Sequence, residues 1–264
     1  MRFFGKGSLF SLALVALLIA RQPQAYSQGE NQTNIQTADE QLLARANQER
    51  AQVGAGRLQW DPALAAAALY HCRRMAAEGP IAHQYRGEPD LASRAGEAGA
   101  HFSLIEENVA VGSSADIIHD SWMHSPGHRT NLLNPEVNRV GIAVVASRGV
   151  LYAVADYSQV VQSLTAIQVE SRVAALIRQS GLSILADPSL ARAACATNEG
   201  VPRSPNSPQP GFVMRWQGSD LTRLPPALVN RMDTRRYHRA AVGSCPAQGL
   251  DGSFTAYRVA VLLF

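Results

Sequence analysis

A proline at position 126 divides the most distinctive stretch of the sequence, SWMHSPGHRTNLLNPE at 121–136, into two predicted helices. Proline lacks a backbone N–H and is tolerated in a helix mainly in its first turn. Ser125, which precedes it, is a favourable N-cap residue. We therefore expect one helix to end at His124 and a new one to begin at Pro126. His124 and His128 are four residues apart but would not share a helix face.

His128 then lies in the first turn of the second predicted helix. The helix dipole disfavours an imidazolium at that end, so the ring should stay neutral and able to bind a metal ion or accept a proton. Its partners must come from other parts of the chain. The candidates are His83, His101, Glu106, Glu107 and His119.

The region 37–160 alternates helical and extended patterns. One predicted helix begins with the capping pair Thr37 and Glu40, and the next begins at Asp61 and ends at Gly79. The later segments are predicted as a strand over 101–112, a helix over 114–125 and a β-hairpin over 140–159. This order of elements favours an α+β arrangement in layers.

The C-terminal part, residues 169–264, repeats the same order in shortened form. ADPSLARAAC echoes WDPALAAAAL, and the final extended pattern echoes the first hairpin. Residues 161–168 form the predicted linker, and a proline-rich loop covers 201–211. We interpret residues 169–264 as a smaller α+β unit and a degenerate copy of the first, with chance agreement of common cap and hairpin signals as the alternative. This copy lacks the first unit's histidines and is expected to be structural or to bind a partner.

The N-terminus has the pattern of an export signal. A basic start is followed by 13 residues without charge and by a polar segment with small side chains. The apolar run is too short to span a bilayer, which takes about 20 residues. We predict a signal peptide over 1–27 and a disordered lead-in over 28–36, with an uncleaved anchor as the alternative. The protein is therefore expected to be secreted or periplasmic.

Charge excludes some classes of partner. The formal net charge is +3, but three of the 24 basic residues lie in the first 21 positions, and without them 21 basic residues face 21 acidic ones. Near neutrality gives no general attraction to nucleic acid or to anionic membranes. No other stretch is long and apolar enough for the mature chain to insert stably into a membrane. The sequence does not indicate an oligomeric state.

Three cysteines are present, and export permits a disulfide. Cys195 and Cys245 fall in the same half of the chain, so we predict that they pair. Cys72 lies in an apolar helical pattern and is expected to be buried and free.

Several motifs together resemble one family. EENVAVG, the SPGHRTNLLNP run and YAVADYSQ, in this order, are similar to the CAP superfamily, also called the SCP or pathogenesis-related-1 family, and match its bacterial secreted members best. The resemblance covers about residues 38–160. It implies a three-layer α-β-α sandwich with a central cleft, in which family members often place two histidines and acidic residues, and some bind zinc or another divalent cation.

Carried over to this chain, the resemblance implies a metal site formed by His83, Glu107 and His128. Larger eukaryotic members have a second cleft glutamate shortly after a tryptophan like Trp122. That glutamate is missing here, with His124 as a substitute candidate. His71, His101, His119 and His238 are expected to be solvated or structural.

Three classes of function remain open, and whether the protein is an enzyme is undecided. The favoured class is an exported binding module whose cleft holds a divalent metal or a small ligand. The alternatives are a metal-assisted hydrolase acting on peptide or envelope material and a lipid or sterol carrier. A triad of Ser125, His128 and Glu107 has the residue types of a hydrolase, but Ser125 is better explained as a helix cap. Cys72 as a nucleophile is disfavoured by its predicted burial.

Overall fold

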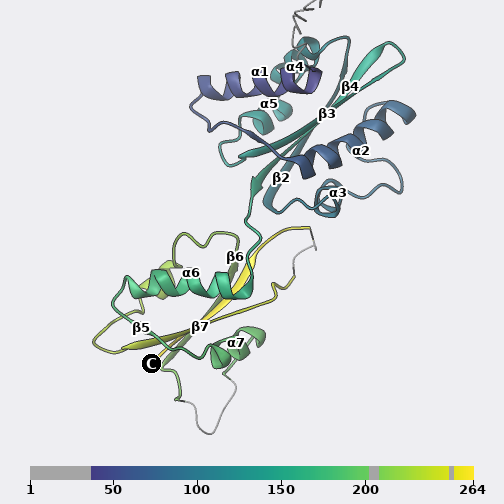
Figure 1. Ribbon diagram of the computed structural model, residues 1–264. Helices are drawn as coiled ribbons and strands as arrows, with labels where there is room; N and C mark the ends of the chain where they lie inside the picture. Colours follow the sequence, from purple (N-terminus) through teal and green to yellow (C-terminus); the bar gives the residue numbers. More distant parts are fainter. Residues whose placement is uncertain (1–36, 202–207, 250–252) are drawn as a thin grey trace, which may run out of the picture. The chain divides into compact units, whose positions relative to one another are not determined.

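The computed structural model describes residues 37–201, 208–249 and 253–264. The predicted signal peptide and lead-in lie outside these residues. The described chain forms two four-stranded sheets, each covered by helices (Figure 1). Among the described residues, no helix combines the length and apolar character needed to cross a membrane.

The first sheet has the strand order β1-β3-β4-β2. β1 runs parallel to β3, and the other neighbouring strands are antiparallel. In this order β2 lies at one edge of the sheet. The elements of this half are α1 (Ala38–Gln52), β1 (Gln59–Trp60), α2 (Pro62–Glu78), α3 (Leu91–Glu97), β2 (Phe102–Gly112), α4 (Ala115–His124), α5 (Pro126–Leu133), β3 (Arg139–Ser147) and β4 (Val150–Val160).

Helices cover both faces of this sheet (Figure 1). On one face, α2 packs on Val109 and Val154, and on the other face α1, α4 and α5 pack on Ala110 and Ala155. Successive strand residues therefore point to opposite cores, as expected for a sheet buried on both sides. The predicted α+β class and its α-β-α layers are confirmed.

The predicted helix break at Pro126 is also confirmed. α4 ends at His124 and α5 begins at Pro126, with Ser125 in an extended conformation between them. The Ser125 side chain makes no capping hydrogen bond, so this residue shapes the junction through its backbone. The cap at Asp61 is present, since its carboxylate accepts hydrogen bonds from the backbone of Ala63 and Leu64 at 2.8 and 3.2 Å.

The second sheet has the order β5-β7-β8-β6, with β5 parallel to β7 and the other neighbours antiparallel. This is the strand arrangement of the first sheet in a shorter form, although common ancestry of the halves stays a prediction. The elements are α6 (Ala166–Arg178), β5 (Ser183–Ile184), α7 (Ser189–Ala196), β6 (Phe212–Gly218), α8 (Pro226–Val229), β7 (Arg239–Cys245) and β8 (Tyr257–Leu263).

In the second half, the start of the first helix differs from the sequence prediction, whereas the disulfide agrees with it. α6 begins at Ala166, inside the predicted linker 161–168, because Thr165 and Gln168 form a capping box. Cys195 and Cys245 form the predicted disulfide, with their Cα atoms 5.8 Å apart. In the first half, Cys72 is buried and free as expected.

One glycine in each half allows a helix to approach its sheet closely. A Cβ atom at Gly141 of β3 would lie 2.0 Å from the backbone nitrogen of Ala65 in α2. A Cβ atom at Gly243 of β7 would lie 2.1 Å from the nitrogen of Arg192 in α7. Neither position can hold a side chain unless the helix moves away.

Candidate functional site

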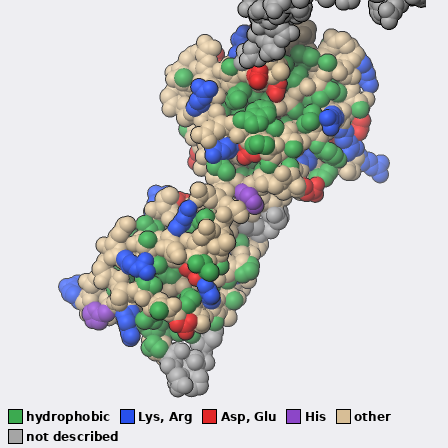
Figure 2. Space-filling view, in the orientation of Figure 1, with side chains coloured by type: hydrophobic (Ala, Val, Ile, Leu, Met, Phe, Trp, Pro, Cys, Tyr) green, Lys and Arg blue, Asp and Glu red, His purple; other side chains and the backbone are tan. Residues whose placement is uncertain are grey.

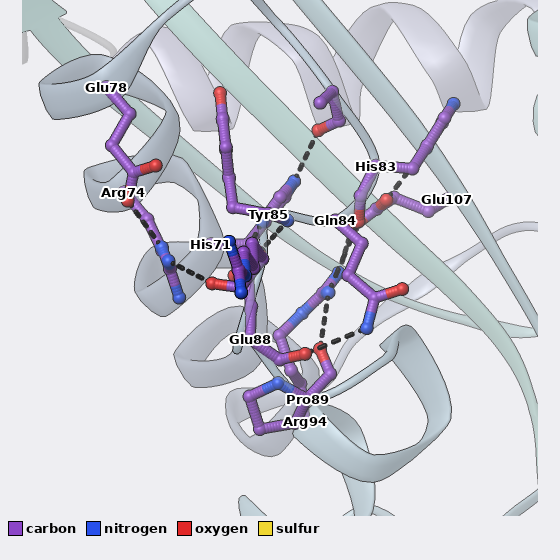
Figure 3. Close-up of polar contacts among 12 residues, drawn as sticks. His71, Arg74, Glu78, His83, Gln84, Tyr85, Glu88, Pro89, Arg94 and Glu107 are labelled. Carbon is purple, nitrogen blue, oxygen red and sulfur yellow. Dashed lines mark hydrogen bonds and ion pairs between the residues drawn. The ribbon is translucent and has the colours of Figure 1, made fainter.

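Glu107 lies on the edge strand β2 and anchors a cluster of polar side chains (Figure 3). Its side chain is almost fully buried, yet both carboxylate oxygens have partners. Oε1 lies 2.8 Å from Nδ1 of His83, which comes from the loop between α2 and α3. Oε2 accepts a hydrogen bond of 2.5 Å from Nη2 of Arg94 in α3. The carboxylate is thus neutralised by a buried guanidinium and fully used for hydrogen bonding.

His83 is the exposed member of the cluster, with a side chain that is 60% accessible. Because an ionised carboxylate only accepts hydrogen bonds, Nδ1 of His83 carries the proton directed at Glu107. This hydrogen bond raises the pKa of His83, against the opposing effects of partial burial and of Arg94. None of the described hydrogen bonds involves Nε2, the other ring nitrogen, which can bind a ligand once its proton is lost.

A buried ion pair holds the loop that carries His83 (Figure 3). Nδ1 of His71 lies 2.8 Å from a carboxylate oxygen of Glu88, and both side chains are fully buried. Nε2 of His71 donates to the backbone oxygen of Ala82 at 2.7 Å, next to His83 in the chain. The second oxygen of Glu88 accepts from the backbone N–H of Tyr85 at 2.9 Å. His71 is therefore structural, as expected, and fixes the backbone from which His83 projects.

His128 is held at the same edge from the other side. The amide of Asn108 on β2 donates to the His128 carbonyl at 2.9 Å, and Asn131 in turn donates to the Asn108 oxygen at 3.0 Å. Burial lowers the pKa of His128, and the charge of His83 lowers it further. The neutral imidazole predicted for His128 is thus favoured, and His83 lies close enough to affect the charge of His128.

The sequence analysis missed two members of the cluster, Arg94 and Asp156. Asp156 on β4 pairs directly with Glu107 across the sheet and is completely buried. Within the described residues, neither carboxyl oxygen makes a hydrogen bond of good geometry, but the side chain interacts with that of Glu107. Burial raises the pKa of Asp156 well above its usual range, and the neighbouring Glu107 raises it further. Burial and the neighbouring carboxylate thus favour the neutral form of Asp156.

The remaining candidates lie elsewhere. Glu106 faces the opposite side of β2 and accepts a hydrogen bond of 2.9 Å from Asn134. His101 is exposed and His119 is buried near Glu49. His124 is exposed and turns back on its own helix. Among the described hydrogen bonds, none joins Ser125 to His128, so the serine triad has no support.

His83 and His128 can serve as metal ligands, but Glu107 cannot serve as the third ligand that the sequence analysis predicted. The described residues contain no group of three or more His, Cys, Asp or Glu side chains placed to hold an ion. Both oxygens of Glu107 are already engaged, which leaves the imidazoles of His83 and His128 as donors. A carboxylate behind a ligating histidine is a usual feature of protein metal sites, because it fixes the ring and increases its basicity.

Comparison with known proteins finds similarity in the first half. A family model described as CAP, the cysteine-rich secretory protein family, matches residues 43–157. The uncharacterized membrane protein YlbC of Bacillus subtilis strain 168 is 32% identical over 127 residues, which cover 47% of this chain and 36% of that protein. The uncharacterized protein YkwD of the same strain is 27% identical over 119 residues, 44% of this chain and 45% of that protein. The chain thus spans less than half the length of these curated relatives.

A solved structure is similar in the same region. An extracellular protein containing an SCP domain from Bacillus anthracis strain Ames is 24% identical, with a TM-score of 0.44, and the match covers 46% of this chain and 40% of that one. The family match, the layered sandwich and the order of the motifs agree. Residues 43–157 therefore match the cysteine-rich secretory protein family, the CAP family, over a little less than half of the chain.

Proposed function

We propose that the protein is an exported binding module whose CAP domain binds a divalent metal ion, with zinc as the first candidate, through Nε2 of His83 and the ring of His128. One observation carries the proposal. Glu107 holds His83 by its Nδ1, and a second histidine, whose pKa is lowered, lies within electrostatic range of His83. Neutral imidazole is a common ligand of zinc and of other late transition metals.

The charges around the site favour a loosely held ion. Glu107 contributes negative charge behind His83, but the buried guanidinium of Arg94 offsets most of it. Two imidazoles also provide fewer ligands than the four of a closed structural zinc site. When bound, the ion would supply a Lewis acid with open coordination positions. A small ligand or peptide with a carboxylate or carbonyl oxygen could occupy them, since His83 is exposed.

Calorimetric titration of the exported form with zinc tests the proposal. His83→Ala or His128→Ala should abolish binding, whereas His124→Ala is the matched control and should leave the affinity unchanged. Glu107→Gln keeps the shape of the side chain but removes its charge, and should weaken binding roughly 10- to 100-fold. Equal loss in the His124 and His128 variants, or no binding by the unmodified protein, would refute the site.

A hydrolase is the second candidate, favoured by the hydrogen bond between His83 and Glu107. A carboxylate that orients an imidazole is the arrangement found around general bases in hydrolytic enzymes. His83 would then take a proton from water at Nε2, since no serine or cysteine contacts it among the described hydrogen bonds. Cleavage of peptide or envelope material that persists after His83→Ala would exclude this role.

A further inference from the structure

Six exposed basic side chains gather at one end of the second sheet, and we propose that this end docks on an anionic phospholipid surface. Figure 2 shows arginines and a histidine together at the lower left of the second half. The residues, called the basic end below, are Arg178, Arg231, Arg235, Arg236, His238 and Arg239.

Separate segments of the chain converge there. Arg178 is the last residue of α6, and a Cβ atom at the following Gly181 would lie 3.5 Å from the methyl group of Thr234, in the loop between α8 and β7. Further along this loop, the His238 carbonyl accepts hydrogen bonds from the backbone and the hydroxyl of Ser183 in β5, at 3.1 and 3.0 Å. The basic end is therefore held together by the fold.

The basic end extends across the whole sheet. The guanidinium of Arg231 lies 5.6 Å from the ring centre of Phe212, which begins the outer strand β6. Arg239 begins β7 and pairs with Ser183 on the opposite outer strand, β5. β7 and β6 are two strand spacings of about 4.8 Å apart, so roughly 10 Å separate these two basic positions. A surface of this width can contact several phosphates at once.

Two acidic side chains of the second half, Glu170 and Asp220, lie away from this end. Glu170 accepts a hydrogen bond of 2.9 Å from the backbone of Ser244, near the far end of β7. Asp220 follows the end of β6, again at the far side of the sheet. These two acids form ion pairs with Arg192 and Arg223, and the basic end lies at the opposite ends of the strands.

The acid that does lie at the basic end is already engaged. Asp233 pairs with Arg235 at 3.1 Å. Among the described ion pairs and hydrogen bonds, the remaining arginines of the loop and strand have no acidic partner. These arginines are Arg231, Arg236 and Arg239, of which Arg236 lies near enough to Asp233 to help lower its pKa.

The two halves differ in charge although they share a topology. Residues 165–264 hold 11 arginines and six acidic residues, whereas residues 37–164 hold ten arginines and 14 acidic residues. The near-neutral total, from which no attraction to membranes is expected, averages over these unlike halves. In the first half, the loop that leads into β3 contains Glu136, and β3 begins with Arg139. The two charges there are opposite and equal in number.

The chemistry of this end fits lipid phosphates. Guanidinium groups bind phosphate oxygens in pairs, and an anionic leaflet presents phosphates in one plane. Val229, 50% exposed at the end of α8, lies two residues before Arg231 and offers an apolar side chain to the headgroup region. An exported chain encounters membrane surfaces more readily than nucleic acid.

Vesicle co-sedimentation of the exported form tests the proposal. The protein should sediment with phosphatidylcholine vesicles that contain phosphatidylglycerol and not with pure phosphatidylcholine, and added salt should release it. The triple variant Arg231→Gln, Arg236→Gln, Arg239→Gln should lower the partition coefficient about 100-fold. The matched control is Arg57→Gln, Arg73→Gln, Arg86→Gln, which removes the same charge from exposed positions of the first half and should bind like the unmodified protein.

Three results would overturn the proposal. They are absence of sedimentation with anionic vesicles, equal loss in the two triple variants, and binding of polyphosphate without binding of vesicles, which would assign the basic end to a soluble polyanion. Circular dichroism of both triple variants checks that the fold is intact. If the basic-end variant is unfolded, the salt dependence of the unmodified protein and its preference for phosphatidylglycerol decide the matter.

Discussion

The two sheets of this protein have the same strand arrangement but different chemistry in the same place. In the first half, one row of residues across three strands runs from Gly141 through Asp156 to Glu107. In the second half, the row that begins at the other close-approach glycine runs from Gly243 through Ala260 to Arg215. Two carboxyl groups are thus replaced by a methyl group and a guanidinium.

Arg215 also shows what the replacement does. Its guanidinium donates to the carbonyl of Ala194 at 2.6 Å and to that of Gly200, so it ties the loop after α7 to the edge strand. Glu107, at the corresponding place, instead orients an exposed histidine. The same edge position fastens a loop in one half and orients the proposed metal ligand in the other. Topology therefore does not determine function here, and the side chains of one row do.

The largest expected effect is the loss of stability when the glycine that begins each row is replaced. It tests whether the rows of the two sheets are structurally equivalent. Gly141→Ala and Gly243→Ala should each destabilise the protein by about 4 kcal/mol or more, because the added methyl group meets helix backbone that cannot step aside. Urea unfolding followed by circular dichroism measures both. Gly127→Ala is the control, since a Cβ atom there meets nothing within 4 Å. If only one of the two buried glycines is sensitive, the rows are not equivalent.

Removal of the disulfide should have a smaller effect on stability, and it should affect the second half without changing zinc binding by the first. Cys245→Ser removes the disulfide to Cys195, which spans 50 residues, and should cost about 2–4 kcal/mol. Because the bond lies within the second half, zinc binding by the first half should be unchanged. Thermal unfolding combined with zinc titration checks both statements. Loss of zinc affinity in this variant would show that the halves do not act independently.

The buried acid of the first row gives the smallest stability effect, and it depends on pH. The pKa of Asp156 is raised in the folded protein, so between the ordinary aspartate pKa and the raised value the folded chain binds more protons than the unfolded one. Stability contributed by the neutral acid is therefore complete at low pH and is lost as the pH rises through the folded pKa. Asp156→Asn avoids this loss.

Asp156→Asn should stabilise the protein at neutral pH by about 1–3 kcal/mol, with a difference that shrinks toward acid pH. Its amide can donate a hydrogen bond to Glu107, the cross-strand neighbour. Denaturant unfolding of both proteins across a pH series measures the difference. A variant that is less stable at every pH would mean that Asp156 is ionised in the folded state.

Local signals in the sequence predicted much of the fold. Pro126 separates two helices, and Asp61 caps a third, through effects that act within a few residues. The pairing of Cys195 with Cys245 followed from their position in one half. The start of α6 was placed three residues too late because the pair Thr165 and Gln168 was not recognised as a capping box.

The candidate site was predicted only in part, because its assembly depends on register. His83 and Glu107 were named through a family resemblance, and the structure joins them at 2.8 Å. Asp156 becomes a partner of Glu107 only through the pairing of β2 with β4, although its strand had been recognised. Arg94 reaches Glu107 from a short helix that the sequence analysis did not predict.

The central claim is that His83 and His128 form one site at the edge of the first sheet, with Glu107 behind His83. Long-range proton–nitrogen NMR of the seven histidine rings, recorded while zinc is added, tests it most directly. We predict that only His83 and His128 shift, that His83 binds through Nε2 and that its Nδ1 keeps its proton. Shifts at His124, metal binding at Nδ1 of His83, or seven unchanged rings would contradict the account.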